Sequence, residues 1–353
     1  MMTSTPLAVR AAPTPAVSSK PPIEISRLGH PRMRVWLLWL AIFYSAWVAL
    51  QLTGAHWPKT LLHWPIALAM ALGSFVAGST PMGGGTVGFP VLVLLFDLPP
   101  SLGRNFGMVI QSVGMTSATI FILCRRSPIE QRVLPFGVAG AAVGLLAGTF
   151  WIAPRIPDDL VKLTFACLWA SFGLLTLAKN REMCAFDSTP EIPLRAAAVQ
   201  GSLVGVAGGV TTALTGVGID MLLYTLLVLR YRMDLKTAVP TSVVIMAIAS
   251  IMGTALHLAI GDLDVELFYN WLAASPVVIL GAPLGAFFVS VIPRVATLYF
   301  VALLCLVQFA WAIYQVAPSA WEWAFVAAVM IAASLVFVLL YRRGLRAAVR
   351  RTC

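Results

Sequence analysis

The sequence predicts an all-α integral membrane protein built from two inverted repeats. Each repeat is expected to hold a re-entrant or broken helical hairpin plus three transmembrane helices, with an extra helix at each end of the chain. Hydrophobic residues make up 59% of the chain, charged residues 11%, and mean hydropathy is +0.89; soluble domains carry about 25% charged residues. Apolar runs of about 17 to 25 residues, each able to cross a bilayer, recur about ten times. Two runs are interrupted by glycine-rich clusters.

The first half of the chain begins with a tail over 1–34 that is rich in Ala, Pro, Ser and Thr. This composition predicts a disordered cytoplasmic segment and not a cleaved signal peptide. A first transmembrane helix is expected over 35–53 and repeat 1 over 61–179. In repeat 1 an apolar stretch stops at 79–86, because Pro81 and three adjacent glycines cannot continue a helix. The helical segments expected in repeat 1 are 61–78, 87–96, 107–123, 134–153 and 160–178.

The second half follows a polar cytoplasmic connector, expected over 180–195, and repeats the same order. Repeat 2 is expected over 196–316, with an interruption in the glycine- and threonine-rich stretch 208–218. A last transmembrane helix is expected over 321–341, before a basic cytoplasmic tail over 342–353. The helical segments expected in repeat 2 are 196–206, 219–229, 238–260, 270–291 and 295–315.

Short matching dipeptides indicate that the two halves are related. Gly73-Ser74 corresponds to Gly201-Ser202, and Gln111-Ser112 corresponds, with a shift of two, to Thr241-Ser242. A pair of glycine-interrupted segments at equivalent places in two halves is typical of a transporter's binding site. The alternative is chance similarity between apolar helices.

The positive charges favour re-entrant hairpins and place both termini in the cytoplasm. Most of the net charge of +10 lies in the two terminal tails. If each interrupted segment is a hairpin, the loop with Arg125, Arg126 and Arg132 is cytoplasmic, whereas a full crossing would put it outside, against the positive-inside rule. An odd number of crossings then inverts the second half. The expected location is the cell (cytoplasmic) membrane, with multiple passes and lipid around the chain; binding to nucleic acid is not expected.

The two breaks are candidates for a small-anion site at the bilayer midplane. Unpaired backbone N–H groups and the positive end of the following helix can hold an oxyanion without a buried full charge. Neutral side chains nearby add donors. The alternative is that small residues serve close packing and that Ser and Thr cap helix ends. The candidate substrate-binding residues are Gly83, Gly84, Gly85, Thr86, Arg104, Gln111, Ser112, Thr116, Thr211, Thr212, Thr215, Gly216, Thr241 and Ser242.

Two charged residues near the breaks each have two interpretations. Asp220 follows the second break and is a candidate for carrying a coupling proton, since an ionisable group within a membrane is costly; it could equally cap the helix that begins there. Arg104 could attract an anion at the mouth or anchor a helix end at the headgroups. His257 and several tryptophans are interpreted as interfacial residues.

The segment from Gly78 to Val91, with the sequence GSTPMGGGTVGFPV, resembles the sulfite exporter TauE/SafE family of bacterial transporters. Gly103-Arg104-Asn105-Phe106 and the stretch 111–117 extend the resemblance, which covers roughly 61–315. The resemblance implies a secondary transporter of sulfite or organosulfonates that works by alternating access, and coupling to protons is compatible with it.

Other classes of function were weighed. A passive anion channel and a transporter of a small carboxylate are compatible with the same breaks. An intramembrane enzyme is not expected, since no HExxH, P-loop or nucleophile motif is present. No cofactor and no metal ion are expected, and a homodimer is a compatible assembly.

Overall fold

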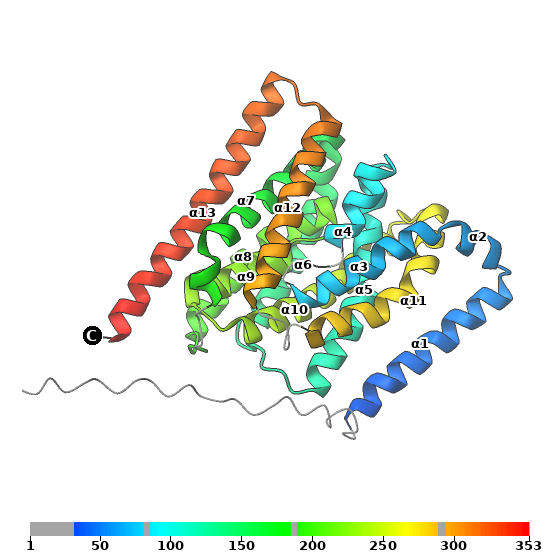
Figure 1. Ribbon diagram of the computed structural model, residues 1–353, viewed down its shortest axis with the longest axis horizontal. Coiled ribbons are helices and arrows are strands. Elements are labelled where there is room, and N and C mark those ends of the chain that lie inside the picture. Colours follow the sequence, from blue (N-terminus) through cyan, green and yellow to red (C-terminus); the bar gives the residue numbers. More distant parts are fainter. Residues whose placement is uncertain (1–31, 81–82, 84, 185–188, 289–293, 353) are drawn as a thin grey trace, which may run out of the picture.

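The computed structural model describes residues 32–80, 83, 85–184, 189–288 and 294–352. Within these ranges the secondary structure is helical and nine helices are long and apolar enough to span a membrane. A shorter apolar helix, Trp64–Ser79, lies between the first two. The chain is therefore an all-α membrane protein, as the sequence predicts (Figure 1).

The first half contains the predicted elements, several of them longer than expected. Pro100 and Pro65 stand in the first turns of their helices, where the missing N–H costs nothing. The elements are α1 (Met33–Thr53), α2 (Trp57–Leu62), α3 (Trp64–Ser79), α4 (Gly85–Phe89), the π-helical η2 (Pro90–Leu95), α5 (Pro100–Cys124), α6 (Leu134–Ala147), η3 (Gly148–Ile152), η4 (Ala153–Arg155) and α7 (Asp158–Cys184).

The second half repeats this order. Its elements are α8 (Leu194–Thr215), α9 (Ile219–Thr225), the π-helical η5 (Leu226–Arg230), α10 (Leu235–Ala259), α11 (Val265–Phe288), α12 (Arg294–Val316) and α13 (Ala320–Thr352). The interruption expected over 208–218 is shorter than predicted, because α8 stays helical to Thr215. Gly208 and Gly209 belong to the helix and serve packing: a Cβ on Gly209 would lie 2.5 Å from the Ala141 carbonyl oxygen.

Both interrupted segments double back on themselves. A Cβ on Gly73 of α3 would lie 2.9 Å from the Cβ of Val87 in α4, so α4 returns along α3. In the same way, Gly208 of α8 lies against Ile219 of α9. We call α3–α4–η2 hairpin 1 and α8–α9–η5 hairpin 2.

Small residues let each hairpin pack closely on one helix of the other half. In hairpin 1, α3 lies on α11, where a Cβ on Gly78 would collide with the Ala282 carbonyl. In hairpin 2, α8 lies on α6, where a Cβ on Gly205 would collide with the Gly137 carbonyl. Lipid provides no hydrophobic drive between helices, so close van der Waals contact must hold them together.

Matching backbone features correct the register between the halves. Asp97 and Arg232 share a positive φ of 54° at the exit of each hairpin. They precede α5 and α10, which have the same length. In this register Gln111 corresponds to Met246 and not to Thr241, so the pairing of Gln111-Ser112 with Thr241-Ser242 is wrong. The π-helical turns η2 and η5, absent from the expected pattern, precede α5 and α10 at matching places, which agrees with this register. The opposite insertion of the two halves stays a prediction.

Polar contacts link the ends of neighbouring helices at the two ends of the molecule. His63 contacts Glu266, and Gln315 donates to Asp97, at the end that we call the acidic end. At the other end, the basic end, Tyr231 donates to Gln200, which joins the exit of hairpin 2 to its beginning.

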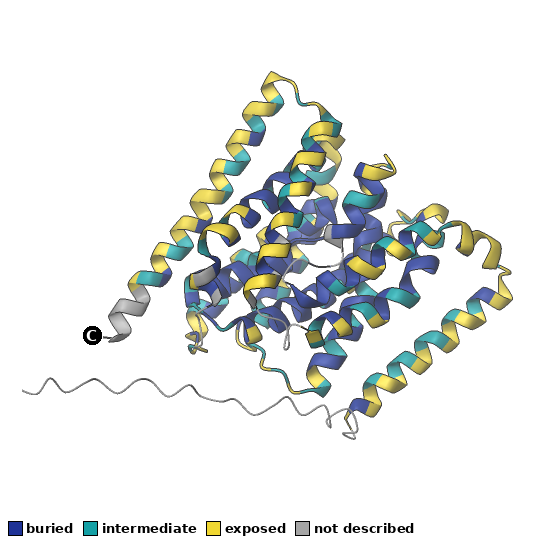
Figure 2. Cartoon of the chain, in the orientation of Figure 1, coloured by how far each residue is buried: buried dark blue, intermediate teal, exposed yellow. Residues whose placement is uncertain are grey.

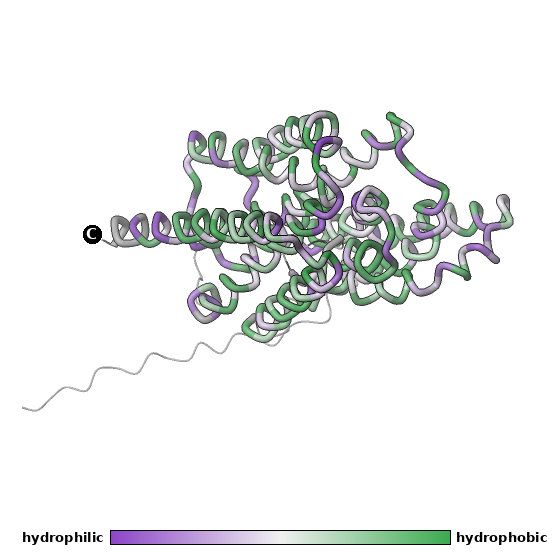
Figure 3. The backbone as a smooth tube through the Cα atoms, turned by 90° about the horizontal axis from the view of Figure 1, so that it is seen from above, coloured by the Kyte–Doolittle hydropathy of each residue, from purple (hydrophilic) through white to green (hydrophobic). Residues whose placement is uncertain are grey.

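The helices α1 and α13 lie at the periphery, whereas α9 and η5 of hairpin 2 lie in the buried centre (Figure 2). Much of α1 and α13 is exposed and apolar, as expected of a surface that faces lipid. The apolar run of α13 ends in a hydrophilic segment at the C-terminus (Figure 3).

The packing of α6 on α8 predicts the effect of one added methyl group. Gly205→Ala should destabilise the protein by roughly 1–3 kcal/mol, because the methyl group must displace the Gly137 backbone. The midpoint of thermal unfolding in detergent measures the change.

Gly107→Ala is the matched control, since its Cβ would find ordinary contacts at 3.5 Å or more. Equal midpoints for the two variants would contradict the close approach of α6 and α8.

Candidate functional site

The tip of hairpin 2 is a turn that only glycine can form. The helix α8 ends at Thr215, and Gly216 follows with φ +79°, its N–H donating to the Thr212 carbonyl at 2.8 Å. Gly218 has φ +127°. A Cβ on Gly216 would also collide with the Arg104 carbonyl of α5. The left-handed backbone and the contact with α5 therefore both require glycine at 216.

Asp220 lies in the first turn of α9 with 1% of its surface exposed. Its Oδ1 accepts hydrogen bonds from the backbone N–H groups of Met221 at 2.9 Å and Gly218 at 3.3 Å. Its Oδ2 is buried and has no hydrogen-bond partner within the described ranges. One oxygen thus caps the helix, as one interpretation of the sequence expects, while the other oxygen stays available.

Gln111 of α5 faces the same point, and its orientation is fixed. Its Nε2 donates to the carbonyl oxygens of Gly107 at 2.8 Å and Gly216 at 3.1 Å. Because both acceptors are carbonyls, the opposite amide orientation would place oxygen against oxygen. The Gln111 Oε1 is buried and without a partner in the described part of the chain.

Gly83 of the first break completes the centre. A Cβ on Gly83 would lie 2.6 Å from both Gln111 Oε1 and Asp220 Oδ2, and its φ is +63°. The first break, α5 and hairpin 2 therefore meet at one place. Two oxygen acceptors converge on that place from different elements.

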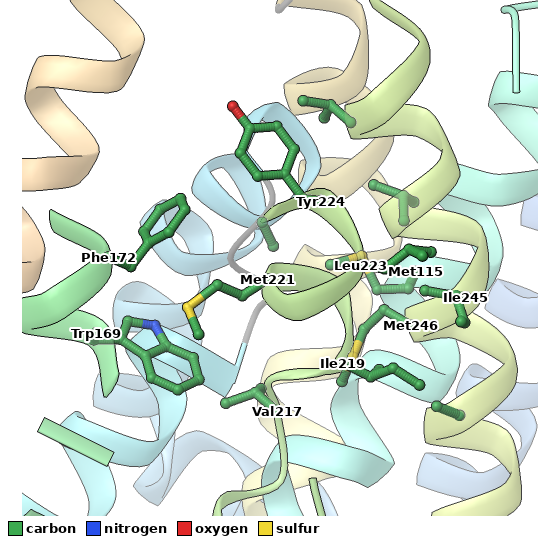
Figure 4. Packing of buried hydrophobic residues seen from close by; sticks show 14 of the residues in the cluster. Met115, Trp169, Phe172, Val217, Ile219, Met221, Leu223, Tyr224, Ile245 and Met246 are labelled. Carbon is green, nitrogen blue, oxygen red and sulfur yellow. The ribbon is translucent and has the colours of Figure 1, made fainter. Parts of the chain in front are cut away.

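Apolar side chains pack on two sides of α9, the helix that carries Asp220 (Figure 4). Trp169 of α7 lies on the side of Met221, while Met246 of α10 and Met115 of α5 lie on the side of Ile219. All five side chains are at most 1% exposed. Such surroundings exclude water and strengthen electrostatic interactions between the remaining polar groups.

The predicted hydroxyl donors are distributed along the helices. Several bond to their own helix: Thr211 donates to Ala207, Thr215 to Thr211 or Val217, Ser112 to Val109, and Ser242 to Val239. The hydroxyls of Thr116 and Thr212 are buried without a partner in the described segments. Gly85 and Thr86 begin α4, and Gly84 lies outside the described residues.

Thr241 lies away from the centre. Its hydroxyl donates to the Thr237 carbonyl at 2.6 Å and accepts from the Glu130 N–H at 2.9 Å. Glu130 belongs to the connection between α5 and α6, at the basic end. The structure therefore brings Gly83, Gln111, Gly216 and Asp220 together but does not add Thr241 to them.

Arg104 belongs to a network at the acidic end. Its guanidinium donates to Asp262 Oδ2 at 2.8 Å, and the His257 Nδ1 lies 2.9 Å from the same oxygen. Asn105 donates to the Asp262 backbone carbonyl. A cavity of about 230 Å³ lies beside this network and extends to Leu214, near the tip of hairpin 2.

The sequence interpretation missed two members of this network. From the sequence, Asp262 has no assigned role, and His257 is expected only at the membrane interface. Asn105 was noted within a motif without a role. The contacts join residues far apart in the chain, so no local spacing signals them.

Comparison with known proteins gives one family. A protein-family model described as "Sulfite exporter TauE/SafE" matches residues 65–312. No curated protein and no solved structure matches the chain. The matched segment runs from the start of α3 into α12, so it contains both hairpins and excludes α1 and α13. The resemblance drawn from the glycine-rich motif is confirmed.

The tip of hairpin 2 generates a prediction with a matched control. Gly216→Ala should destabilise the protein clearly more than Gly261→Ala. Both positions have a positive φ, and this left-handed backbone costs an alanine about 1–2 kcal/mol. A Cβ on Gly261, however, meets nothing within 4 Å.

Thermal unfolding in detergent measures the difference. If Gly261→Ala proves as harmful as Gly216→Ala, the close contact between the hairpin tip and α5 is wrong.

Proposed function

Because the chain belongs to the sulfite exporter TauE/SafE family, whose members are membrane transporters, we propose that it is a secondary transporter of a small anion. The substrate is sulfite or an organosulfonate, and it crosses the cytoplasmic membrane by alternating access. The observation that carries this proposal is the meeting of the first break, Gln111 and Asp220 in a dry centre. Irregular backbone inside a membrane is tolerated where it is buried in protein or lines a cavity.

The anion is held at the first break, while Asp220 carries the coupling proton. In the corrected register Gly85 stands where hairpin 2 has Asp220. Asp220 Oδ1 accepts hydrogen bonds from the N–H groups at the start of α9. Gly85 has no side chain that could accept hydrogen bonds at the start of α4. The helix α4 continues directly into η2, and the first N–H groups of such a helix, with its positive end, are the groups that would hold an oxyanion.

The cavity beside Arg104 is the outer vestibule of this path. The Arg104 guanidinium at its wall offers an anion a positively charged contact, although Asp262, which pairs with it, and Asp158, which also lines the cavity, oppose this attraction. His257 also lines the cavity. The vestibule extends toward Leu214 and thus toward the hairpin tip, which supports a continuous route.

The charge distribution supports an orientation. The basic end carries Arg132 before α6, Arg195 in the first turn of α8 and Lys236 in the first turn of α10. The acidic end carries Asp262, Asp264 and Glu266. The basic end and both termini therefore face the cytoplasm. In this arrangement repeat 1 (61–179) and repeat 2 (196–316) enter the membrane from opposite sides, surrounded by lipid, and a homodimer remains compatible.

A passive channel using the same breaks is the second candidate. The enclosed centre favours a carrier, because the apolar side chains around α9 are at most 2% exposed and line no open pore within the described residues. A transporter of a small carboxylate would use the same N–H groups.

Flux into proteoliposomes tests the proposal. Purified protein should carry sulfite or an organosulfonate with saturable kinetics, with counterflow, and faster under an imposed pH gradient. Non-saturating flux without counterflow would favour the channel. Absence of flux for any sulfur oxyanion, in protein shown to be folded, would contradict the substrate assignment, and carboxylate flux would redirect it.

Arg104 provides a test of the vestibule. Arg104→Gln should raise the KM for the anion about fivefold at low salt, as expected for losing about 1 kcal/mol of attraction at a partly exposed site. The increase should shrink at high salt.

Arg155→Gln is the matched control, since Arg155 lies in η4 near the cavity but does not line it. Equal effects of the two substitutions would show that only general surface charge matters.

A further inference from the structure

The unpaired oxygens of Gln111 and Asp220 form a site with a definite chemical preference. Both side chains are 1% exposed, and both atoms lack a hydrogen-bond partner among the residues that the structure describes. A Cβ on Gly83 would lie 2.6 Å from each, so the two oxygens border the same small space. Two buried acceptors repel an anion, and a buried acceptor left without a donor is costly. The space therefore suits a positively charged occupant.

We propose that this space holds one exchangeable proton, shared between Asp220 Oδ2 and Gln111 Oε1. This inference rests on the proposed transport function and specifies its coupling site. Asp220 Oδ2 takes up a proton from water, and the resulting O–H donates a hydrogen bond to Gln111 Oε1. Gln111 is a positioning residue and proton-site acceptor, not a donor to the substrate as the sequence suggested.

The fixed orientation of the Gln111 amide indicates which occupant the space holds. Its Nε2 bonds to Gly107 and Gly216 keep Oε1 directed toward Asp220. A rotated amide could otherwise satisfy the carboxylate without any proton. A sodium ion prefers several oxygen ligands, whereas the described residues offer two free oxygens here, which is the number that one shared proton needs.

No charged side chain competes for this proton among the described neighbours. Asp220 Oδ1 accepts only backbone N–H groups. On the same helix, the phenol-bearing Tyr224 packs its ring against Phe172 of α7, 6.0 Å away. The nearest basic residue of α5, Arg104, bonds to Asp262 and Asn105 at the acidic end.

Within the described residues the site occurs once, despite the repeat. The positions equivalent to Gln111 and Asp220 are Met246 and Gly85, neither of which offers an acceptor side chain. The proton therefore joins α5 of the first half to hairpin 2 of the second half. When the proton leaves, a carboxylate and an amide oxygen face each other and repel, which loosens the contact between α5 and the hairpin tip.

Infrared difference spectroscopy of the purified protein, without substrate, tests the proposal. A carbonyl-stretch band of a protonated carboxyl should be present at low pH and vanish as the pH rises. Asp220→Asn should remove this band. Gln111→Leu should keep it but move it to higher frequency, because the O–H loses its acceptor. Ser112→Ala is the matched control and should leave the band unchanged, since its hydroxyl bonds within α5.

Several outcomes would overturn the proposal. One is the absence of any band that depends on Asp220, in protein that unfolds cooperatively like the wild type. Another is a band that Gln111→Leu does not shift. A third is loss of the band when sodium replaces choline at constant pH, which would assign the site to sodium. This measurement is made without substrate, so its result is independent of the flux measurement. A band without anion flux would contradict the transport function alone, and flux without the band would contradict the proton site alone.

Discussion

The hydrogen bonds from the Gln111 amide to the carbonyls of Gly107 and Gly216 fix the centre of this protein. They bind α5 to the tip of hairpin 2 and at the same time determine which atom of the amide faces Asp220. The backbone at Gly216 must be left-handed and close to Arg104 for this to occur. The left-handed turn at Gly216 thus fixes the orientation of the Gln111 amide, and this orientation makes an oxygen acceptor face Asp220.

The rest of the fold keeps these elements at short range. Helices in lipid gain little from hydrophobic association, so the pairs α3–α11 and α6–α8 depend on glycines at which a side chain would meet backbone. Those pairs brace each hairpin against the other half. The apolar shell of Trp169, Met221 and Met246 then excludes water from the centre. A transporter needs such a closed centre, because a continuous water path would dissipate any gradient that drives it.

The sequence predicted the membrane class, the order of the helices and the family, because hydropathy and the Gly83–Thr86 break are local signals. It overestimated the length of the second break. A glycine pair such as Gly208-Gly209 can either interrupt a helix or let another helix pack closely on it, and the sequence does not distinguish the two. It misjudged the register at Gln111, because two short matching dipeptides in apolar helices do not fix an alignment. It also grouped Thr241 with the centre by residue type. The contacts of Asp262 with Arg104 and His257, and the convergence of Gln111 with Asp220, depend on tertiary packing that no spacing encodes.

The proposed transport depends on two hairpins that enter the membrane from opposite sides and meet near its middle. Single cysteines can test this in a background without the native cysteines, using an impermeant maleimide on sealed vesicles of known orientation. Lys59→Cys and Ser101→Cys flank hairpin 1 and should react from one side; Glu191→Cys and Lys236→Cys flank hairpin 2 and should react from the other. Labelling of the two residues that flank one hairpin from opposite sides would contradict the account.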